Sequence, residues 1–448
     1  MSLKLRKPYY PAPWLRLPRD ILDVAILGGG QSGLAIAYGL RRAGIDNLRI
    51  FDQAALGGQG VWQSVARMRS LRTDKNITGP ELGNPLLSYR YWHETTQGAE
   101  SFAALERIPR LHWQAYLDWF AAETRAQTLF EHRLQKVDLG HPLRLTFQTP
   151  AGPRVVLARH LVLATGMDGF GAPYIPSALR ALVAPEHLRH SQEMLSPAQD
   201  FTGKRLVVLG GSASAFDVAA TALEAGAREV VQVTRNPQLA LQEPLGDLRD
   251  LVAATRHFHL WPEADRWAHV LQKRARGTAP PQSIARAKAW GNYSLREGEG
   301  LAKLAPRAGG ISYEGRAFDG VIAATGYRQG AHLREEFRPL AGLIRQWGDL
   351  HLPHSPAEAH WGALPYLGAG FELLPKSPEH AAVSRLHVFT FAAILSHGFH
   401  VGDIASAQET VPRLVAHLSE ALFRESRGLG LAAEGKFPLS PPLQREEA

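Results

Sequence analysis

The chain has 448 residues, of which 45% are hydrophobic and 21% charged, and it contains no cysteine. This balance is ordinary for a globular protein of two or three domains. The missing thiols exclude disulfides, zinc–thiolate centres, iron–sulfur clusters and a cysteine nucleophile. No apolar run is long enough to predict a membrane span, and the N-terminus lacks the apolar core of a secretory signal, so we expect a cytoplasmic protein.

The formal net charge is +8, and the positive excess is concentrated in residues 1–20 and 245–310. A basic field can attract nucleic acid or a phosphorylated ligand. The chain has no run of five like charges and no basic patch interleaved with aromatic residues. We therefore expect a cofactor that carries phosphate groups, and no nucleic-acid partner.

A glycine-rich turn between two apolar strands is the first motif in the chain. Asp23–Ile26 predicts a buried strand, Ser32–Ala43 a helix and Leu48–Phe51 a second strand that ends at Asp52. In such a unit the first glycine makes the turn, the second admits a pyrophosphate and the third lets helix and strand pack closely. The acid after the second strand accepts hydrogen bonds from a ribose. The motif predicts an FAD site formed by Gly28, Gly30, Gln31, Ser32, Gly33, Asp52 and Gln53.

A second copy of this motif begins at Arg205 and aligns with the first without a gap. Thr234 and Arg235 stand where the first copy has Asp52 and Gln53. A guanidinium can bind a 2′-phosphate that a carboxylate would repel, so this copy favours NADPH over NADH. Ser212 replaces the middle glycine, which makes backbone approach to the phosphates less close. The predicted NADPH residues are Gly210, Ser212, Ala213, Ser214, Arg235 and Thr325.

Two apolar strands end in the same Ala-Thr-Gly triplet, at residues 164–166 and 324–326. Each lies where the chain would cross between two nucleotide domains, and together with the repeat they predict an α/β fold. Two dinucleotide-binding (Rossmann-like) domains are expected, with the NADPH domain inserted into the FAD domain. The expected layout is a Pro-rich lead at 1–19, FAD-binding parts at 20–167 and 326–448, and an NADPH-binding domain at 168–325 with a helical insert at about 244–310.

These motifs resemble the class B flavoprotein monooxygenases along nearly the whole chain. The matching segments are the glycine motif at 28–33, Gly60-Val61-Trp62, the Leu-Arg-Thr segment at 71–73, residues 108–120, the second motif and Ala-Thr-Gly-Tyr-Arg at 324–328. The resemblance implies that Trp62 runs beside the flavin. It also implies that Gly402-Asp403, before a long amphipathic helix, holds the ribityl chain of FAD, with Ser396-His397-Gly398 close by.

The resemblance implies that NADPH reduces FAD and that molecular oxygen then gives a C4a-(hydro)peroxyflavin. This species would oxygenate a small-molecule substrate: a soft nitrogen or sulfur atom, an electron-rich ring or a ketone. One alternative is an NADPH-dependent flavin reductase or dehydrogenase that does not oxygenate. Another is a non-catalytic flavin-binding sensor. The sequence leaves open whether the protein forms a homodimer.

The sequence departs from the family pattern at two places. Ala184 and Glu186 replace the Phe and Gly of the fingerprint that precedes the second motif, although His190 is present. The Thr-Asn pair that supports the oxygenated flavin in flavin-containing monooxygenases is here Thr73-Asp74, followed by Lys75 and Asn76. An ionised Asp accepts but does not donate a hydrogen bond, so Asp74 would have to be protonated or paired with Lys75. The candidate catalytic residues are Asp74, Lys75 and Asn76.

Between residues 244 and 310 the NADPH-binding domain has more chain than its fold requires. We interpret this segment as a lid or as a wall of the substrate site. Helical stretches are predicted at Asp247–His257 and Glu263–Arg276, with aromatic residues Trp261, Trp267, Trp290 and Tyr293 in the same region. No metal site is predicted, because the pairs His257/His259 and His351/His354 lack a carboxylate partner at a suitable spacing.

Overall fold

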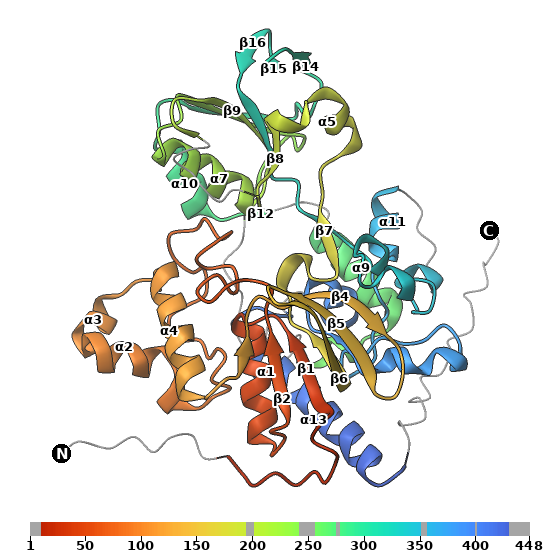
Figure 1. Cartoon of the computed structure of the whole chain (residues 1–448). Helices are drawn as coiled ribbons and strands as arrows, with labels where there is room; N and C mark the ends of the chain where they lie inside the picture. The colour runs from red at the N-terminus through yellow and green to blue at the C-terminus, as the bar shows by residue number, and fades with distance from the viewer. Residues whose placement is uncertain are drawn as a thin grey trace.

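The computed structural model describes residues 10–193, 201–241, 256–274, 278–350, 356–398 and 401–429. The chain forms two lobes that lie one above the other in Figure 1. The lower lobe contains both ends of the described chain, and the upper lobe is built from the middle of the sequence. None of the described helices combines the length and apolar character needed to cross a membrane.

The lower lobe is organised around a mixed sheet in the order β3-β2-β1-β6-β5-β4, with β19 paired to β6. Strands β2, β1, β6 and β19 are parallel, and β4, β5 and β6 form an antiparallel meander. The strand bounds are β1 Leu22–Leu27, β2 Leu48–Phe51, β3 Thr128–Leu129, β4 Arg133–Asp138, β5 Leu143–Thr149, β6 Gly152–Leu163 and β19 Leu386–Val388. The central strands carry Val, Ile and Leu on both faces because helices and the meander cover the sheet on both sides.

Helices surround this sheet (Figure 1). They are α1 Gln31–Arg42, α2 Tyr89–Gln97, α3 Ala99–Ala104, α4 Arg110–Glu123, α11 Pro356–Gly362, α12 Ile394–His397 and α13 Ala407–Ser426. Helix α13 is the predicted long amphipathic helix, and its Val411 and Val415 pack against Gly39 of α1. Residues from both ends of the sequence therefore share one core.

The upper lobe repeats the arrangement with a parallel sheet in the order β13-β10-β9-β17-β8. The strand bounds are β8 Leu188–His190, β9 Arg205–Leu209, β10 Glu229–Thr234, β13 Tyr293–Glu297 and β17 Gly320–Ala323. The remaining elements are α5 Ser177–Leu182, α7 Ala213–Glu224, α10 Pro281–Lys288, β11 Ala240–Leu241, β12 Thr278–Ala279, β14 Leu304–Arg307, β15 Gly310–Tyr313 and β16 Arg316–Phe318. The predicted α/β fold with two Rossmann-like units, the second inserted into the first, is confirmed.

Two of the passages of the chain between the lobes lie side by side. Strand β7 (Gly171–Pro173) leaves the lower lobe, and β18 (Tyr327–Gln329) returns to it as the antiparallel partner of β7. A Cβ on Gly171 would lie 1.9 Å from the carbonyl oxygen of Arg328, so only glycine fits this crossing.

The predicted insert is divided between the lobes. The helix expected at Glu263–Arg276 is observed as α9, Glu263–Arg274. Phe258 and Val270 join Trp347, Leu364, Tyr366, Ile394 and Leu395 in a separate hydrophobic cluster on the lower lobe. By contrast α10 packs on α7, and β13 is an edge strand of the upper sheet, so residues 278–297 belong to the nucleotide fold itself. Most of the helix predicted at Asp247–His257 lies outside the described residues.

Candidate active site between two dinucleotide cradles

The first glycine motif forms a tight cradle at the end of β1. Gly28 has φ +102°, and a Cβ there would lie 2.4 Å from the carbonyl oxygen of Ala164. A Cβ on Gly33 would lie 1.9 Å from the carbonyl oxygen of Gly28, so strand and helix touch at this glycine. Helix α1 begins after Gly30 with no side-chain cap and no acidic residue in its first turn. Its free N–H groups and positive dipole end are therefore open to a pyrophosphate.

Asp52 closes this cradle from the end of β2. Its Oδ2 accepts a hydrogen bond from the backbone N–H of Gly29 at 2.7 Å, and its Oδ1 accepts one from Ala54 N–H at 2.8 Å. The side chain thus fixes the glycine loop, while each carboxylate oxygen keeps a lone pair for a ribose hydroxyl. Gln53 beside it is exposed.

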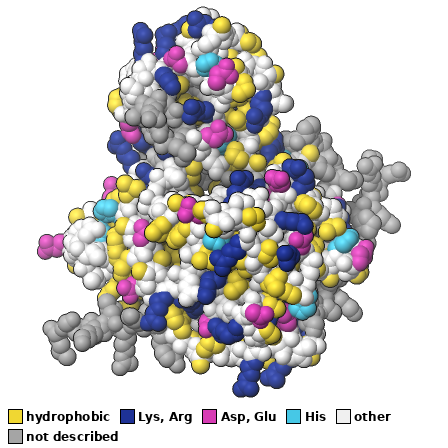
Figure 2. Space-filling model, viewed as in Figure 1, with side chains coloured by type: hydrophobic (Ala, Val, Ile, Leu, Met, Phe, Trp, Pro, Cys, Tyr) yellow, Lys and Arg dark blue, Asp and Glu magenta, His cyan; other side chains and the backbone are white. Residues whose placement is uncertain are grey.

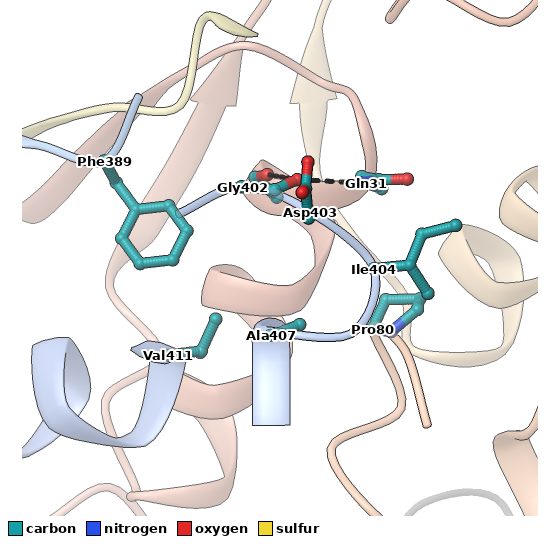
Figure 3. A pocket seen from close by; sticks show the side chains of 9 residues that line it. Gln31, Pro80, Phe389, Gly402, Asp403, Ile404, Ala407 and Val411 are labelled. Carbon is teal, nitrogen blue, oxygen red and sulfur yellow. Dashed lines mark hydrogen bonds between the residues drawn. The ribbon is translucent and has the colours of Figure 1, made fainter. Parts of the chain in front are cut away.

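The chain returns to the first cradle at Gly402 and Asp403, far along the sequence. The Gln31 side-chain amide donates to the carbonyl oxygen of Gly402 at 2.8 Å, and Ser32 Oγ donates to the same oxygen at 3.4 Å (Figure 3). Trp113 Nε1 donates to Gln31 Oε1 at 3.2 Å and so fixes the amide from the other side. A pocket beside the loop is lined by Gln31, Ser32, Pro80, Phe389, Gly402, Asp403, Ile404, Ala407 and Val411 (Figure 3).

A second pocket also borders the first cradle. Gly29, Gly30 and Leu34 line it together with Gln59 of the loop after β2 and with residues of α4 and the β3 strand end: Gln114, Leu117, Asp118, Ala121, Thr128 and Phe130. Residues at the start of α1 and in the glycine loop therefore line both pockets.

The second cradle repeats the first in the upper lobe. Gly210 has φ +146°, and a Cβ on it would lie 2.5 Å from the carbonyl oxygen of Ala324. Ser212 precedes α7 with φ −113° and ψ −178°, an extended conformation that any residue adopts, so replacing the middle glycine causes no backbone strain. Its side chain does not cap the helix, and the first turn has no acidic residue, which leaves the α7 N-terminus open.

The other residues predicted for NADPH surround this cradle. Thr234 lies under Gly211, where a Cβ would be 2.5 Å from Thr234 Oγ1, as Asp52 lies under Gly29. Arg235 follows β10, is exposed, and forms no ion pair with any described residue, so its guanidinium is available to a ligand. Thr325 donates from its hydroxyl to the carbonyl oxygen of Tyr174, which joins the two inter-lobe passages. Ala213 and Ser214 occupy the first turn of α7.

Trp62 lies near the first cradle and is partly buried against the core of the lower lobe. Gly60, two residues earlier, approaches Gly30 so closely that a Cβ on Gly30 would lie 3.3 Å from Gly60 Cα. The guanidinium of Arg110 donates to the carbonyl oxygen of Trp62. The structure therefore places the Gly60-Val61-Trp62 segment against the cradle.

The three candidate catalytic residues do not form one group. Asp74 is exposed, and its Oδ1 accepts from both the backbone N–H of Asn76 at 2.8 Å and the side-chain amide of Asn76 at 3.0 Å. Lys75 points away and donates to the carbonyl oxygens of Phe102, Ala103 and Leu105 at 2.8, 3.1 and 2.5 Å. Of the two conditions set for Asp74, pairing with Lys75 is not met, because the ammonium group binds the carbonyls at the end of α3.

Ser396 and His397, which were expected beside the flavin site, form their hydrogen-bond contacts with residues of the core. Ser396 Oγ accepts from Trp347 Nε1 and from Leu367 N–H, each at 3.1 Å. His397 is stacked on Phe371, and its Nε2 contacts the carbonyl oxygen of Gly368 at 3.0 Å. Burial and the nearby Arg413 charge hold the pKa of His397 well below its usual value. Both side chains are therefore parts of the buried core.

The described residues contain one set that could hold a metal ion, Glu372, His387 and His417. His387 uses both ring nitrogens in hydrogen-bond contacts: Nδ1 with the carbonyl oxygen of Gly370 at 2.9 Å and Nε2 with His160 Nδ1 at 3.2 Å. Burial lowers the pKa of His387 to about 3, so the ring is neutral at physiological pH. This contact pattern describes a hydrogen-bonded core cluster.

The sequence did not reveal the contacts that hold the two lobes together. Arg72 and Asp217 form an ion pair across the lobes, and Ser283 Oγ donates to Asp217 Oδ1 at 2.7 Å. A second pair joins Arg69 to Glu224 at 2.6 Å. Asp217 and Glu224 are seven residues apart on α7, a spacing that puts both on one helix face. From the sequence, this spacing indicates that the two carboxylates face the same neighbouring surface. It does not identify the arginines that they bind.

Three matches to known proteins all point to monooxygenases. Residues 90–283 match the family described as L-lysine 6-monooxygenase/L-ornithine 5-monooxygenase. An FAD-dependent urate hydroxylase from Xanthomonas campestris pv. campestris is 32% identical over 437 residues, which cover 93% of this chain and 90% of the relative. An L-lysine N6-monooxygenase from Escherichia coli is 31% identical over 144 residues, covering 31% of this chain and 32% of the relative.

The fold is also that of a solved N-hydroxylase. The ornithine N-hydroxylase of Kutzneria sp. 744, whose structure contains reduced FAD, NADP+ and L-ornithine, superposes with a TM-score of 0.69 at 14% identity, covering 89% of this chain and 99% of that one. Fold and cradles define an α/β oxidoreductase with two dinucleotide sites. Full-length similarity to a curated relative shows more: the chain belongs to the class B flavin-dependent monooxygenases and is an FAD- and NADPH-dependent enzyme.

Proposed function

We propose that the lower-lobe cradle binds FAD and the upper-lobe cradle binds NADPH. The FAD-binding unit comprises residues 20–167 and 326–448, and the NADPH-binding unit comprises residues 168–325. Two observations support this division. Gly29 N–H is bound by the Asp52 carboxylate in the first cradle, whereas the second carries Thr234 and an exposed, unpaired Arg235 among the described residues. A carboxylate suits a free ribose, and a guanidinium suits a 2′-phosphate.

The residues proposed to contact FAD come from three parts of the chain. The glycine motif contributes Gly28, Gly30, Gln31, Ser32 and Gly33, the end of β2 contributes Asp52 and Gln53, and Trp62 and Asp403 complete the site. FAD supplies the redox chemistry when bound. The chain's part is to hold the pyrophosphate at the α1 N-terminus and to fix the ribityl region through the Gln31–Gly402 hydrogen bond.

The residues proposed for NADPH are Gly210, Ser212, Ala213, Ser214, Arg235 and Thr325. The open α7 N-terminus accepts the pyrophosphate, and Thr325 stabilises the passage between the lobes. The catalytic assignment narrows to Asp74 and Asn76, because Lys75 is occupied by the carbonyl oxygens after α3. Asn76 can donate a hydrogen bond through its amide, which the ionised Asp74 cannot.

We propose further that the substrate is an electron-rich heterocyclic ring of the urate type. The observation that supports this is the 32% identity with a urate hydroxylase over 93% of this chain. The amine-hydroxylating relative matches only 31% of the chain, and the match to the N-hydroxylase structure is one of fold. We also propose that the enzyme is cytoplasmic.

The first test is rapid mixing of NADPH-reduced protein with oxygen while the flavin spectrum is followed. A species distinct from oxidised and reduced flavin supports a monooxygenase, and coupled consumption of NADPH with urate, but not with L-ornithine or L-lysine, supports the ring substrate. Formation of hydrogen peroxide alone with urate and coupled oxygenation of an amine would overturn the substrate proposal. Failure of NADPH to reduce the flavin would overturn the assignment of the second cradle.

A further inference from the structure

Two arginines at the junction of the lobes come from adjacent backbone segments. Arg67 follows the turn in which Ala66 N–H donates to the Val61 carbonyl oxygen, and Arg110 is the first residue of α4. The segments are joined by the hydrogen bond from Arg110 N–H to the Arg69 carbonyl oxygen at 3.0 Å and by the bridge between Ser70 and Pro109. The carbonyl oxygen of Arg67 also accepts from the Arg286 guanidinium of the upper lobe at 2.6 Å.

Within the described residues, these two guanidinium groups have no acidic partner, unlike the arginines next to them. Nε and Nη2 of Arg67 are buried and form no hydrogen bond with any described residue. Arg110 donates to the Trp62 carbonyl oxygen, and neither arginine forms an ion pair within the described parts of the chain. The nearby carboxylates are already used, since Glu224 binds Arg69 and Arg286, and Asp217 binds Arg72.

The local electrostatics are unfavourable without an anion. Burial lowers the pKa of Arg67, and the charge of Arg110 lowers it further. Burial also lowers the pKa of Arg110, to which the charge of Arg286 adds. Both residues are partly buried, so each unpartnered charge carries part of the cost of a buried charge, and like charges side by side increase that cost. A bound anion would remove both penalties.

We propose that Arg67 and Arg110 form a phosphate-binding site at the lobe junction, separate from the two glycine-loop cradles. A guanidinium matches the geometry of a phosphate through paired N–H donors, and two of them supply the charge for a doubly ionised group. Lys and Arg side chains are also visible along the junction in Figure 2. The sites proposed above already place the phosphates of FAD and NADPH at the α1 and α7 N-termini and at Arg235, so the ligand proposed here is a further phosphate group. Inorganic phosphate is the probe for it.

The test uses the FAD-loaded enzyme and three variants. Arg67→Gln and Arg110→Gln remove the charges, and Arg69→Gln is the matched control, because Arg69 lies in the same segment but is exposed and paired with Glu224. Three quantities are measured: flavin content after purification, the NADP+ dissociation constant by calorimetry, and the rise in Tm with inorganic phosphate. The Arg67→Lys variant keeps the positive charge but lacks the planar pair of N–H donors. Comparing it with Arg67→Gln therefore distinguishes an effect of donor geometry from an effect of charge.

The expected result is loss of the phosphate-induced rise in Tm in both test variants and not in Arg69→Gln, with flavin content and NADP+ affinity unchanged. Loss of flavin or weaker NADP+ binding in both test variants, with the phosphate-induced rise in Tm retained, would overturn the proposal of a separate site and assign the two arginines to a cofactor phosphate. The proposal is overturned if both test variants match the wild type in all three measurements, or if Arg69→Gln changes equally. None of these readouts depends on oxygenation, so the proposal is tested independently of the substrate.

Discussion

Arg72 of the lower lobe and Asp217 of the upper lobe form an ion pair with Nη2 and Oδ2 2.7 Å apart. The Asp217 side chain is 6% exposed and that of Arg72 is 27% exposed, so the pair is largely removed from solvent. Arg72 immediately precedes Thr73 and Asp74, and Asp217 lies just over one turn into α7. The pair therefore connects the segment of the candidate catalytic residues to the helix that begins at the proposed NADPH site.

Asp217→Asn should destabilise the protein, because it leaves the Arg72 charge without its partner. We expect a loss of about 2 kcal/mol, between the values for an exposed pair and for a fully buried pair, because Arg72 is partly exposed. The rate of flavin reduction by NADPH should fall as well, since the lobes lose a fixed contact. Thermal unfolding and anaerobic stopped-flow reduction measure the two effects. Asp46→Asn, which removes the exposed partner of Arg19, is the control and should change neither.

Arg235→Ala should weaken NADPH binding by about 1–3 kcal/mol, roughly fivefold to 150-fold, with little effect on NADH. The reason is that an exposed guanidinium at the end of β10 distinguishes the two nucleotides through the 2′-phosphate. Dissociation constants for both nucleotides, measured on the same FAD-loaded preparation, provide the comparison. Equal weakening of NADPH and NADH would remove the reason to assign this residue to the 2′-phosphate.

Asp52→Ala should yield protein with little bound FAD. The substitution removes the acceptor for both Gly29 N–H and Ala54 N–H, and each buried donor left unpaired costs on the order of 1–3 kcal/mol. Asp52→Asn keeps one acceptor oxygen and should retain an intermediate flavin content. The flavin-to-protein absorbance ratio after purification measures this series. Full occupancy in the alanine variant would mean that the first cradle does not bind FAD through Asp52.

Lys75→Met should lower stability and leave the chemistry of the folded enzyme unchanged. The ammonium group binds three carbonyl oxygens around the end of α3 and lies 4.8 Å from the Phe102 ring centroid, so its loss should cost about 1–2 kcal/mol. The measurements are Tm and the ratio of oxygenated product to hydrogen peroxide. A large rise in peroxide at unchanged flavin content would instead give Lys75 a part in the reaction.

Glu81 predicts a pH-dependent effect on stability. Burial raises its pKa from 4.5 to about 7, although the Gly79 N–H at 2.8 Å partly offsets this. A carboxyl group with a raised pKa binds its proton more tightly in the folded state, so its contribution to stability is greatest below pH 4.5 and is lost as the pH rises to about 7. The shift corresponds to roughly 3 kcal/mol.

Glu81→Gln removes this titration. The Tm of the variant relative to the wild type should therefore rise between pH 5 and pH 8, as followed by differential scanning fluorimetry. The exposed Glu100→Gln is the control and should show no such trend. A constant difference between Glu81→Gln and wild type over this range would show that Glu81 is ionised throughout.

The sequence determined the repeated framework of this protein. The two strand–glycine–helix units were predicted from spacing, and β1, α1 and β2 form within a residue of the expected bounds. The two Ala-Thr-Gly strands form beside the glycine loops, where carbonyl oxygens of Ala164 and Ala324 contact Gly28 and Gly210. Local patterns of apolar residues and glycines suffice for this because the strand, glycine turn, helix and second strand of each unit are consecutive in the sequence.

Only the tertiary structure decided which distant residues meet. Gly402 joins Gln31, Arg72 joins Asp217, and Lys75 binds the end of α3 in place of Asp74. A side chain of given charge has many partners available in the sequence, and the packing of lobes and helices selects one. The same packing leaves Arg67 and Arg110 without a carboxylate among the described residues, because Asp217 and Glu224 are already bound to other arginines.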